Sequence, residues 1–260
     1  MQTKRIFASF AFTMLTVLLL LIVASRSGEA DAGAADIDAN LGPGMPAPTE
    51  RAELPGSKED NETTLGEKPD IDITSWEYML AGPDNNIGKY TPSRVVAIEG
   101  TAQYFDERAI TPLINFLNGA REAGYTTYIM TAYRSYATQE YLLNGRASQI
   151  AWPEYPTAAD YAEAELYVAA PGESDHQTGL AVDIADRYYG TMDASQMDQG
   201  LLTWLREHCA EYGFILRYPS AKSSITGRDE PWHFRYVGVE AATYIMENNL
   251  CLEQFKALYQ

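Results

Sequence analysis

Two short stretches of the chain, ESDHQTGLAVDI and EPWHF, contain the residue types that bind a metal and activate water. The first holds His176 and Asp183, and the second holds Glu230 and His233. Two imidazoles and one carboxylate form a ligand set that suits catalytic Zn²⁺, which keeps a fourth position open for water. Glu230 lies shortly before His233 in the chain, so it can act as a base on that water without being a ligand. We therefore predict one Zn²⁺ per chain, bound by His176, Asp183 and His233, with Glu230 as a catalytic residue.

The run GLAVDI predicts a short buried strand that carries Asp183. Its residues are mostly branched or small and apolar, and Gly179 stands at its beginning. Side chains alternate along a strand, so Asp183 points away from the face that Val182 occupies. A buried carboxylate without a partner is costly, and Asp183 therefore needs a cation or strong donors. His176 precedes the strand in a loop that Gly179 allows to turn back, so both side chains can reach one point.

A single histidine or aspartate at such a spacing is more often a structural residue, and only the complete strings favour a metal site. The pattern S-x-H-x-x-G-x-A-x-D, followed by E-x-W-H, resembles the zinc D-Ala-D-Ala carboxypeptidases of the VanY type. These are related to the VanX dipeptidases and to the L,D-carboxypeptidases. The resemblance implies an α+β fold, in which helices flank a small, mainly antiparallel sheet that carries the zinc site.

The stretch YRSYATQ places Arg134 at the exit of a strand predicted over residues 125–131. A guanidinium there can bind a carboxylate or stabilise a developing oxyanion. An isolated arginine is more often part of a surface ion pair, but this stretch also resembles the Y-R-S-x-x-x-Q motif of the same family. The resemblance implies that Arg134 and Gln139 face the substrate. We expect Arg134 to be catalytic as well as substrate-binding, and Gln139 and Ser174 to hold the substrate carboxylate in roles that the sequence leaves undivided.

Hydrophobic periodicity predicts the remaining elements of the domain. One helix is expected from residue 105, with Asp106 and Glu107 in its first turn, and another ends near Cys209. The latter carries His208, which matches no family position and is interpreted as a surface residue. Further helices are predicted after Arg134 as far as residue 143, over 158–169 and over 239–248, and further strands over 214–218 and 232–237.

Residues 1–26 predict a targeting segment. Lys4 and Arg5 precede an apolar run of roughly the 20 residues that cross a bilayer. Because the residues around Ala24 also resemble a cleavage site, the segment is interpreted as a signal peptide or an N-terminal membrane anchor. The catalytic domain would then lie outside the cytoplasm, held at the cell membrane or secreted.

Residues 27–70 are rich in Ala, Gly, Pro and acidic side chains and contain almost no aromatic or β-branched ones. Such a segment cannot bury enough apolar surface to offset the entropy of ordering it, so we predict a disordered acidic linker. Residues 71–260 are ample for one domain, which we expect to be a monomer. The net charge of −17 argues against a nucleic-acid partner.

Cys209 and Cys251 are the 2 cysteines of the chain. Both lie in apolar, helix-like surroundings, which is compatible with two separate buried thiols. An exported domain with two cysteines nevertheless favours a disulfide, and we predict a Cys209–Cys251 bond.

The resemblance implies a zinc metallopeptidase that acts on the end of a peptidoglycan stem peptide. The leading hypothesis is a D,D-carboxypeptidase that removes the C-terminal D-Ala. An L,D-carboxypeptidase acting on tetrapeptide stems is the nearest alternative, and the export signal disfavours a cytoplasmic D-Ala-D-Ala dipeptidase. A non-catalytic cell-wall binding module is the alternative from another class, and the intact set of catalytic residues argues against it.

Overall fold

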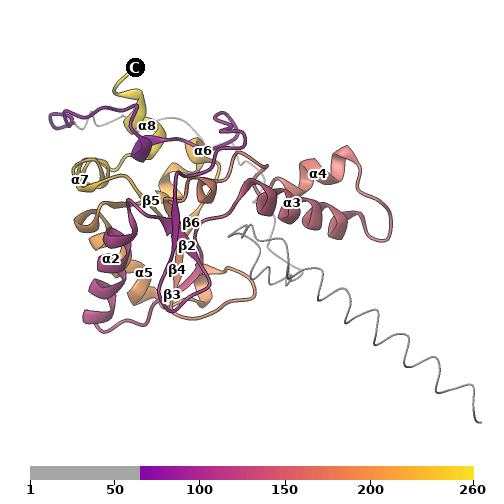
Figure 1. Cartoon of the computed structure of the whole chain (residues 1–260), viewed down its shortest axis with the longest axis horizontal. Coiled ribbons are helices and arrows are strands. Elements are labelled where there is room, and N and C mark those ends of the chain that lie inside the picture. Colours follow the sequence, from indigo (N-terminus) through magenta and orange to yellow (C-terminus); the bar gives the residue numbers. More distant parts are fainter. Residues whose placement is uncertain (1–64) are drawn as a thin grey trace, which may run out of the picture. The chain divides into compact units, whose positions relative to one another are not determined.

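The computed structural model describes residues 65–260 (Figure 1). The predicted targeting segment and most of the predicted linker lie outside these residues. The strands are β1 (Val95–Ala97), β2 (Tyr104–Asp106), β3 (Tyr128–Thr131), β4 (Ala181–Ala185), β5 (Phe214–Tyr218) and β6 (Glu230–Tyr236). The α-helices are α2 (Ile110–Glu122), α3 (Tyr136–Ala151), α4 (Ala158–Ala164), α5 (Gln199–His208), α6 (Ser223–Thr226), α7 (Val239–Glu247) and α8 (Leu252–Ala257). Short 3₁₀ helices include η1 (Trp76–Tyr78), η2 (Asp175–Thr178), η3 (Ala194–Gln196), η4 (Cys209–Tyr212) and η5 (Ser220–Lys222).

A four-stranded sheet forms the centre of the domain, with the order β3-β4-β6-β5. Every neighbouring pair in it is antiparallel, and β1 and β2 form a separate antiparallel pair. The α+β class and the small antiparallel sheet flanked by helices are therefore confirmed. The strands β4 and β6 are the two central strands, so each has a hydrogen-bonded neighbour on both sides.

One face of the sheet packs against α2 and α5, which lie side by side in Figure 1. Val182 and Ile184 of β4 point into this core, as the alternation of side chains predicts. Phe116 of α2 lies at its centre, with its ring 5.3 Å from the ring of Phe214 and 5.5 Å from that of Phe234. This apolar layer leaves Asp183 and its neighbours to the other face of the sheet.

The helix predicted from residue 105 begins later. Phe105 and Asp106 belong to β2, and α2 begins only at Ile110, so the expected place of Asp106 and Glu107 in its first turn is wrong. Asp106 is buried and accepts hydrogen bonds of 2.9 and 2.6 Å from the Arg108 guanidinium. Pairing with β1 and burial of the Phe105 ring outweigh the helical tendency of these residues.

The helices α3 and α4 form a hairpin with a small core of its own. Leu143, Ala147 and Ala164 are buried in it, with Tyr161 and Val168 packed at its edge. The helix α3 extends beyond its predicted end at residue 143 to Ala151, and α4 ends at Ala164 rather than at residue 169. Figure 1 shows the two helices adjacent and set away from the four-stranded sheet.

The C-terminal helices α7 and α8 pack around Ile215 and Val237. Residues just before the predicted domain boundary contact this part of the domain. The Tyr244 hydroxyl donates to the Gly66 carbonyl at 3.1 Å, and the Tyr259 hydroxyl donates to the Pro69 carbonyl at 2.7 Å. The packed domain therefore includes a few residues that the sequence assigned to the linker.

The predicted Cys209–Cys251 disulfide is absent, and both residues are buried free thiols. Cys209 lies in the core beneath α2 and α5, where its thiol donates to the Arg206 carbonyl. Cys251 caps the beginning of α8, and its thiol contacts the Gln254 side chain. Each thiol packs within its own element, so separate burial, the alternative interpretation, describes the structure.

Within residues 65–260, no helix combines the length and the apolar character that a bilayer-crossing segment requires.

Candidate metal centre

Asp183 and His233 lie opposite each other on the two central strands. Their Cα atoms are partners in the antiparallel register of β4 and β6, so both side chains leave the sheet on the same face. His233 Nδ1 lies 3.1 Å from Asp183 Oδ1. Sheet register alone therefore places two of the three predicted ligands.

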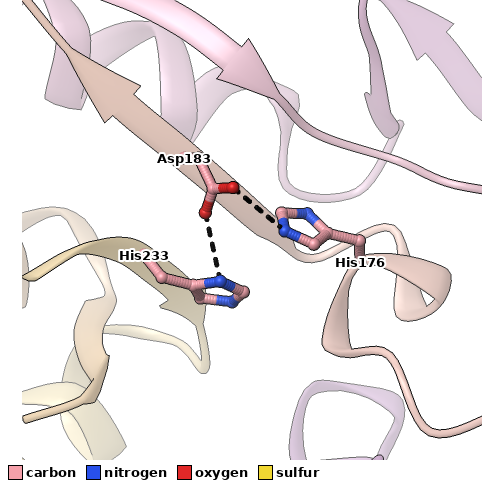
Figure 2. A group of neighbouring side chains, drawn as sticks. All are labelled: His176, Asp183 and His233. Atoms are coloured by element: carbon pink, nitrogen blue, oxygen red, sulfur yellow. Dashed lines mark ion pairs between the residues drawn. The ribbon is translucent and has the colours of Figure 1, made fainter. Parts of the chain in front are cut away.

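His176 completes the group from η2, which ends at Gly179 with a left-handed φ of 74°. A side chain at Gly179 would be strained by this φ, and its Cβ would lie 2.8 Å from Pro92 Cγ, so glycine is needed for the turn into β4. His176 Nε2 lies 3.3 Å from Asp183 Oδ2, and Figure 2 shows Asp183 between the two imidazoles. One ligand atom from each of the three residues lies within 4.8 Å of the others.

The three side chains fit a tetrahedral metal such as Zn²⁺. Asp183 Oδ1 and His233 Nδ1 are buried yet have no hydrogen-bond partner, which is unusual for such atoms and is explained by a cation between them. Zinc–ligand distances of about 2.0 Å give tetrahedral edges of about 3.3 Å. The separations of 3.1 and 3.3 Å between ligand atoms match such edges.

In each histidine, the ring nitrogen that faces away from the metal site contacts a hydrogen-bond acceptor. His176 Nδ1 donates to the Ala132 carbonyl at 2.8 Å, which leaves its Nε2 lone pair free for a metal. His233 Nε2 lies 3.4 Å from Asp175 Oδ2, which leaves Nδ1 as the ligand atom. These contacts select the tautomer that each ligand needs.

The surroundings of the site favour positive charge. Burial acts to raise the pKa of Asp183, but the two imidazoles outweigh it and hold this pKa below its usual range. Burial lowers the pKa of His176, which favours the neutral imidazole that a metal ligand requires. Burial also acts against charge on His233, yet Asp183, Asp175 and Glu230 around it raise its pKa well above the usual value. A group of carboxylates that favours a proton on His233 also favours a cation in its place.

Glu230 reaches the site because β6 bulges. In a regular strand Glu230 and His233 would point to opposite faces. The register of β6 with β5 shifts between the pair Leu216↔Phe234 and the pair Tyr218↔Glu230. The strand β6 therefore has more residues than β5 over this stretch, which is a β-bulge. Glu230 Oε2 consequently lies 3.2 Å from His233 Nδ1, beside the ligands.

Arg134 is held beside the site by Gln139. Its Nη1 donates to Gln139 Oε1 at 2.9 Å, and Gln139 Nε2 donates to the Ala169 carbonyl at 2.6 Å. Gln139 is fully buried, and both ends of its amide are engaged. The structure thus gives Gln139 a supporting role toward Arg134, and its direct contact with a substrate carboxylate stays a prediction.

A cavity of about 310 Å³ opens over the metal ligands. It brings together every predicted site residue, and Ser174 lies buried in its wall. The cavity is lined by Arg134, Gln139, Leu142, Arg146, Tyr167, Val168, Ala169, Glu173, Ser174, Asp175, His176, Asp183, Gly190, Thr191, Met192, Tyr218, Arg228, Glu230, Trp232 and His233.

Sequence reasoning missed a buried charge network behind His233. Asp175 accepts a hydrogen bond from Arg235 Nη1 and lies 3.8 Å from Arg217 Nε. Arg217 in turn forms a bidentate pair with Glu253 of α8, at 3.0 and 2.7 Å. Burial acts to raise the pKa of Asp175, but Arg235 and its other partners lower it below the usual range. The alternation of β6 offered a signal, because it puts Arg235 on the same face as His233.

Arg228 is the other residue that sequence reasoning missed. Its Nη1 donates to Glu230 Oε1 at 3.1 Å, so it fixes the orientation of the predicted base. His208, in contrast, lies away from the site as predicted. It pairs with Glu211 at 2.7 Å and stacks on Trp204.

Comparison with known proteins agrees with this geometry. The family model of VanY, D-alanyl-D-alanine carboxypeptidase, matches residues 102–239. A D-alanyl-D-alanine carboxypeptidase of Enterococcus faecalis is 36% identical over 186 residues, which cover 71% of this chain and 67% of that protein. A metallopeptidase class is thus defined by fold and site together, and the chain belongs to the VanY family of D-alanyl-D-alanine carboxypeptidases.

Two solved structures of similar chains contain bound ligands. A mutant of the vancomycin resistance D,D-pentapeptidase VanY, from a VanB-type cassette, was solved with Zn(II). It is 34% identical, with a TM-score of 0.59, over 70% of this chain and 99% of that one. VanYB in complex with D-alanine-D-alanine is 33% identical, with a TM-score of 0.61, over 72% of this chain and 100% of that one.

Proposed function

We propose that this chain is a zinc-dependent D,D-carboxypeptidase that removes the C-terminal D-Ala from peptidoglycan stem peptides. The observation that carries the proposal is the convergence of His176, Asp183 and His233, with Glu230 3.2 Å from His233, in one cavity. Membership of the VanY family, and the ligands in the solved structures of two similar proteins, support the metal and the substrate class.

His176, Asp183 and His233 would hold the zinc. When bound, zinc supplies a Lewis acid and brings the pKa of a coordinated water to about 7. Glu230 accepts the proton of the attacking water and then delivers it to the nitrogen of the departing D-Ala. Its hydrogen bond from Arg228 keeps one carboxylate oxygen occupied and leaves Oε2 directed at the reaction.

Arg134 stabilises the oxygen of the scissile carbonyl as it becomes an oxyanion. Its hydrogen bond to Gln139 fixes its position before the substrate arrives, which is the arrangement that makes such stabilisation effective. Ser174, which lines the cavity, would donate a neutral hydrogen bond to the carboxylate of the terminal D-Ala.

The place of action proposed for the enzyme is the outer face of the cell membrane. This part of the proposal rests on the sequence of residues 1–26 and of the acidic linker 27–70, which would hold the domain away from the bilayer. Cell fractionation tests it, because an uncleaved segment keeps the chain with membranes and cleavage near Ala24 releases it. Recovery of the chain in the cytoplasm would contradict both forms.

Mass spectrometry of synthetic stem peptides tests the activity. The purified chain with zinc should remove one D-Ala from a pentapeptide and leave the resulting tetrapeptide intact, and a chelator should stop the reaction. Cleavage of the tetrapeptide in preference would identify an L,D-carboxypeptidase. A cell-wall binding module would retain the peptides without cleaving either one.

A further inference from the structure

The loop between α3 and α4 exposes two large aromatic side chains. Trp152 is 81% exposed and Tyr155 is 93% exposed. Large aromatic side chains are enriched at binding surfaces, where they contribute much of the binding energy. We refer to Trp152 and Tyr155 together as the aromatic tip, and the proposed chemistry gives it no role.

The aromatic tip stands on a firm support. The Tyr161 hydroxyl of α4 donates to Asn144 Oδ1 of α3 at 2.9 Å, and the apolar side chains between the helices form a core. Thr157, next to the tip, begins α4 with a capping box in which it exchanges hydrogen bonds with Asp160. The two helices that flank the aromatic tip are thus fixed to each other.

The catalytic cavity runs along α3 toward this tip. Gln139, Leu142 and Arg146 of α3 all line it, and their spacing puts them on one face of the helix. Arg134 and the metal ligands lie at the beginning of this helix, and the tip lies just beyond its end. A substrate cleaved at the metal would therefore extend along α3 in the direction of the tip.

The length of a stem peptide matches the distance along α3 from the catalytic cavity to the aromatic tip. A helix rises about 1.5 Å per residue, so the path from Gln139 to Trp152 measures about 20 Å. An extended peptide advances about 3.3 Å per residue, so the stem between the scissile carbonyl and its first residue spans about 13 Å. The link from that residue to its sugar covers much of the remainder and brings the sugar near the tip.

Charge excludes the other common partners of exposed aromatic rings. Glu154 and Glu163 are exposed close to the tip, and residues 147–170 contain no lysine or arginine. An anionic lipid surface would be repelled, since binding to one needs basic residues. A neutral sugar ring carries weakly positive C–H groups that stack on the negative face of an aromatic ring.

We propose that the aromatic tip binds the glycan strand from which the stem peptide hangs, and so holds polymeric peptidoglycan while the peptide end enters the cavity. This proposal rests on the proposed function, because the stem peptide fixes the distance between the two sites. Trp152 and Tyr155 supply the stacking surface, and α3 supplies the spacing.

Binding to insoluble peptidoglycan tests the role of the tip. The full chain with Trp152→Ala and Tyr155→Ala should co-sediment about tenfold more weakly than the wild type, while its kcat/KM on a soluble pentapeptide stays unchanged. The pair Trp152→Phe and Tyr155→Phe keeps both rings and should retain most of the binding. A matched control is Tyr128→Ala with Tyr188→Ala, which removes another exposed aromatic pair, 43% and 48% exposed, and should have no effect.

Competition and vesicle binding separate the possible occupants. Glycan strands freed of their peptides should displace the wild type from peptidoglycan, and the alanine pair should leave binding to anionic and neutral vesicles unchanged. Equal co-sedimentation of the alanine pair and the wild type would overturn the proposal. A loss confined to vesicle binding, or a change of oligomeric state in light scattering, would overturn it in favour of a membrane or of a second copy. Inactivity of the wild type on the pentapeptide would instead remove the proposed function on which the inference rests.

Discussion

Both histidine ligands of the candidate metal site are held by a second contact from behind. The Ala132 carbonyl orients His176, and the Asp175 carboxylate orients His233. Asp183 has no such contact at Oδ1 and depends on its place in β4. The chemistry of the site is therefore sensitive to residues that never touch a substrate.

Glu230→Gln should lower kcat by a factor of about 10² to 10⁴ while the protein still binds zinc, because the amide cannot accept the proton of the attacking water. Activity on a pentapeptide and metal content measured on the same sample check this. Glu211→Gln is the matched control, since Glu211 also pairs with a histidine but lies away from the cavity. A variant at position 230 with the wild-type kcat would show that another group is the base.

Asp175→Asn should weaken zinc affinity about 10- to 100-fold, because the amide no longer fixes the ring of His233 as a carboxylate does. Competition with a chromophoric chelator measures this independently of activity. Asp186→Asn, which removes a carboxylate that accepts from Tyr189 and lies outside the cavity, should leave the affinity unchanged. An unaltered affinity in the Asp175 variant would limit the buried network to a structural role.

Arg134→Ala should reduce kcat about 10²- to 10³-fold with a small change in melting temperature, as expected for loss of an oxyanion donor. Gln139→Ala should cost less, and the double variant should resemble Arg134→Ala alone, because Gln139 acts through Arg134. Independent, multiplying losses in the double variant would instead show that Gln139 contacts the substrate itself.

At the scale of elements, the strands β4 and β5 were predictable from composition because each is short, apolar and bounded by clear breakers. The ligands on β4 and β6, Asp183 and His233, were predictable from motif, but their arrangement was not. Alternation assigns Asp183 to a face, yet only the sheet order shows that β6 is the neighbour of β4. The bulge that turns Glu230 toward His233 depends on the partner strand β5, and a pattern within β6 does not reveal it.

Cys209 lies at the end of α5 and Cys251 at the beginning of α8, and both are free thiols. Because Cys209 and Cys251 are separate thiols, we expect two labelled thiols per chain after denaturation without reductant. Burial raises the pKa of Cys209 to about 12, so at pH 8 its thiol should react far more slowly in the folded protein than in the unfolded one. Mass spectrometry of the alkylated protein checks both statements, and a mass lacking both labels would restore the disulfide.

At the scale of the whole molecule, the metal site unites distant parts of the chain. His176, Asp183 and His233 come from η2, β4 and β6, so no short fragment contains the site. A metal that binds only the folded domain stabilises it by mass action, by about 4 kcal/mol when its concentration is 1,000 times Kd. Removing zinc with a chelator should therefore lower the melting temperature, and adding zinc back should restore it. The variant His233→Ala is the control, and it should respond to neither treatment.

The class of the domain was predictable, because the motifs and the apolar periodicity both lie within residues 71–260. The α3–α4 hairpin was only partly predictable. Its helices follow from periodicity, but the exposure of Trp152 and Tyr155 does not, since aromatic residues in a sequence are more often buried. Exposure is a property of packing, and packing of the hairpin depends on contacts between both helices.

The pairing of β4 with β6 fixes the distance between Asp183 and His233, whatever the length of the chain between the two strands. Part of that intervening chain, at Gly190, Thr191 and Met192, forms a wall of the catalytic cavity. Insertions or deletions there would reshape the wall without shifting either ligand. Evolution and protein engineering can therefore retune which peptide end is accepted while the hydrolytic machinery stays as it is.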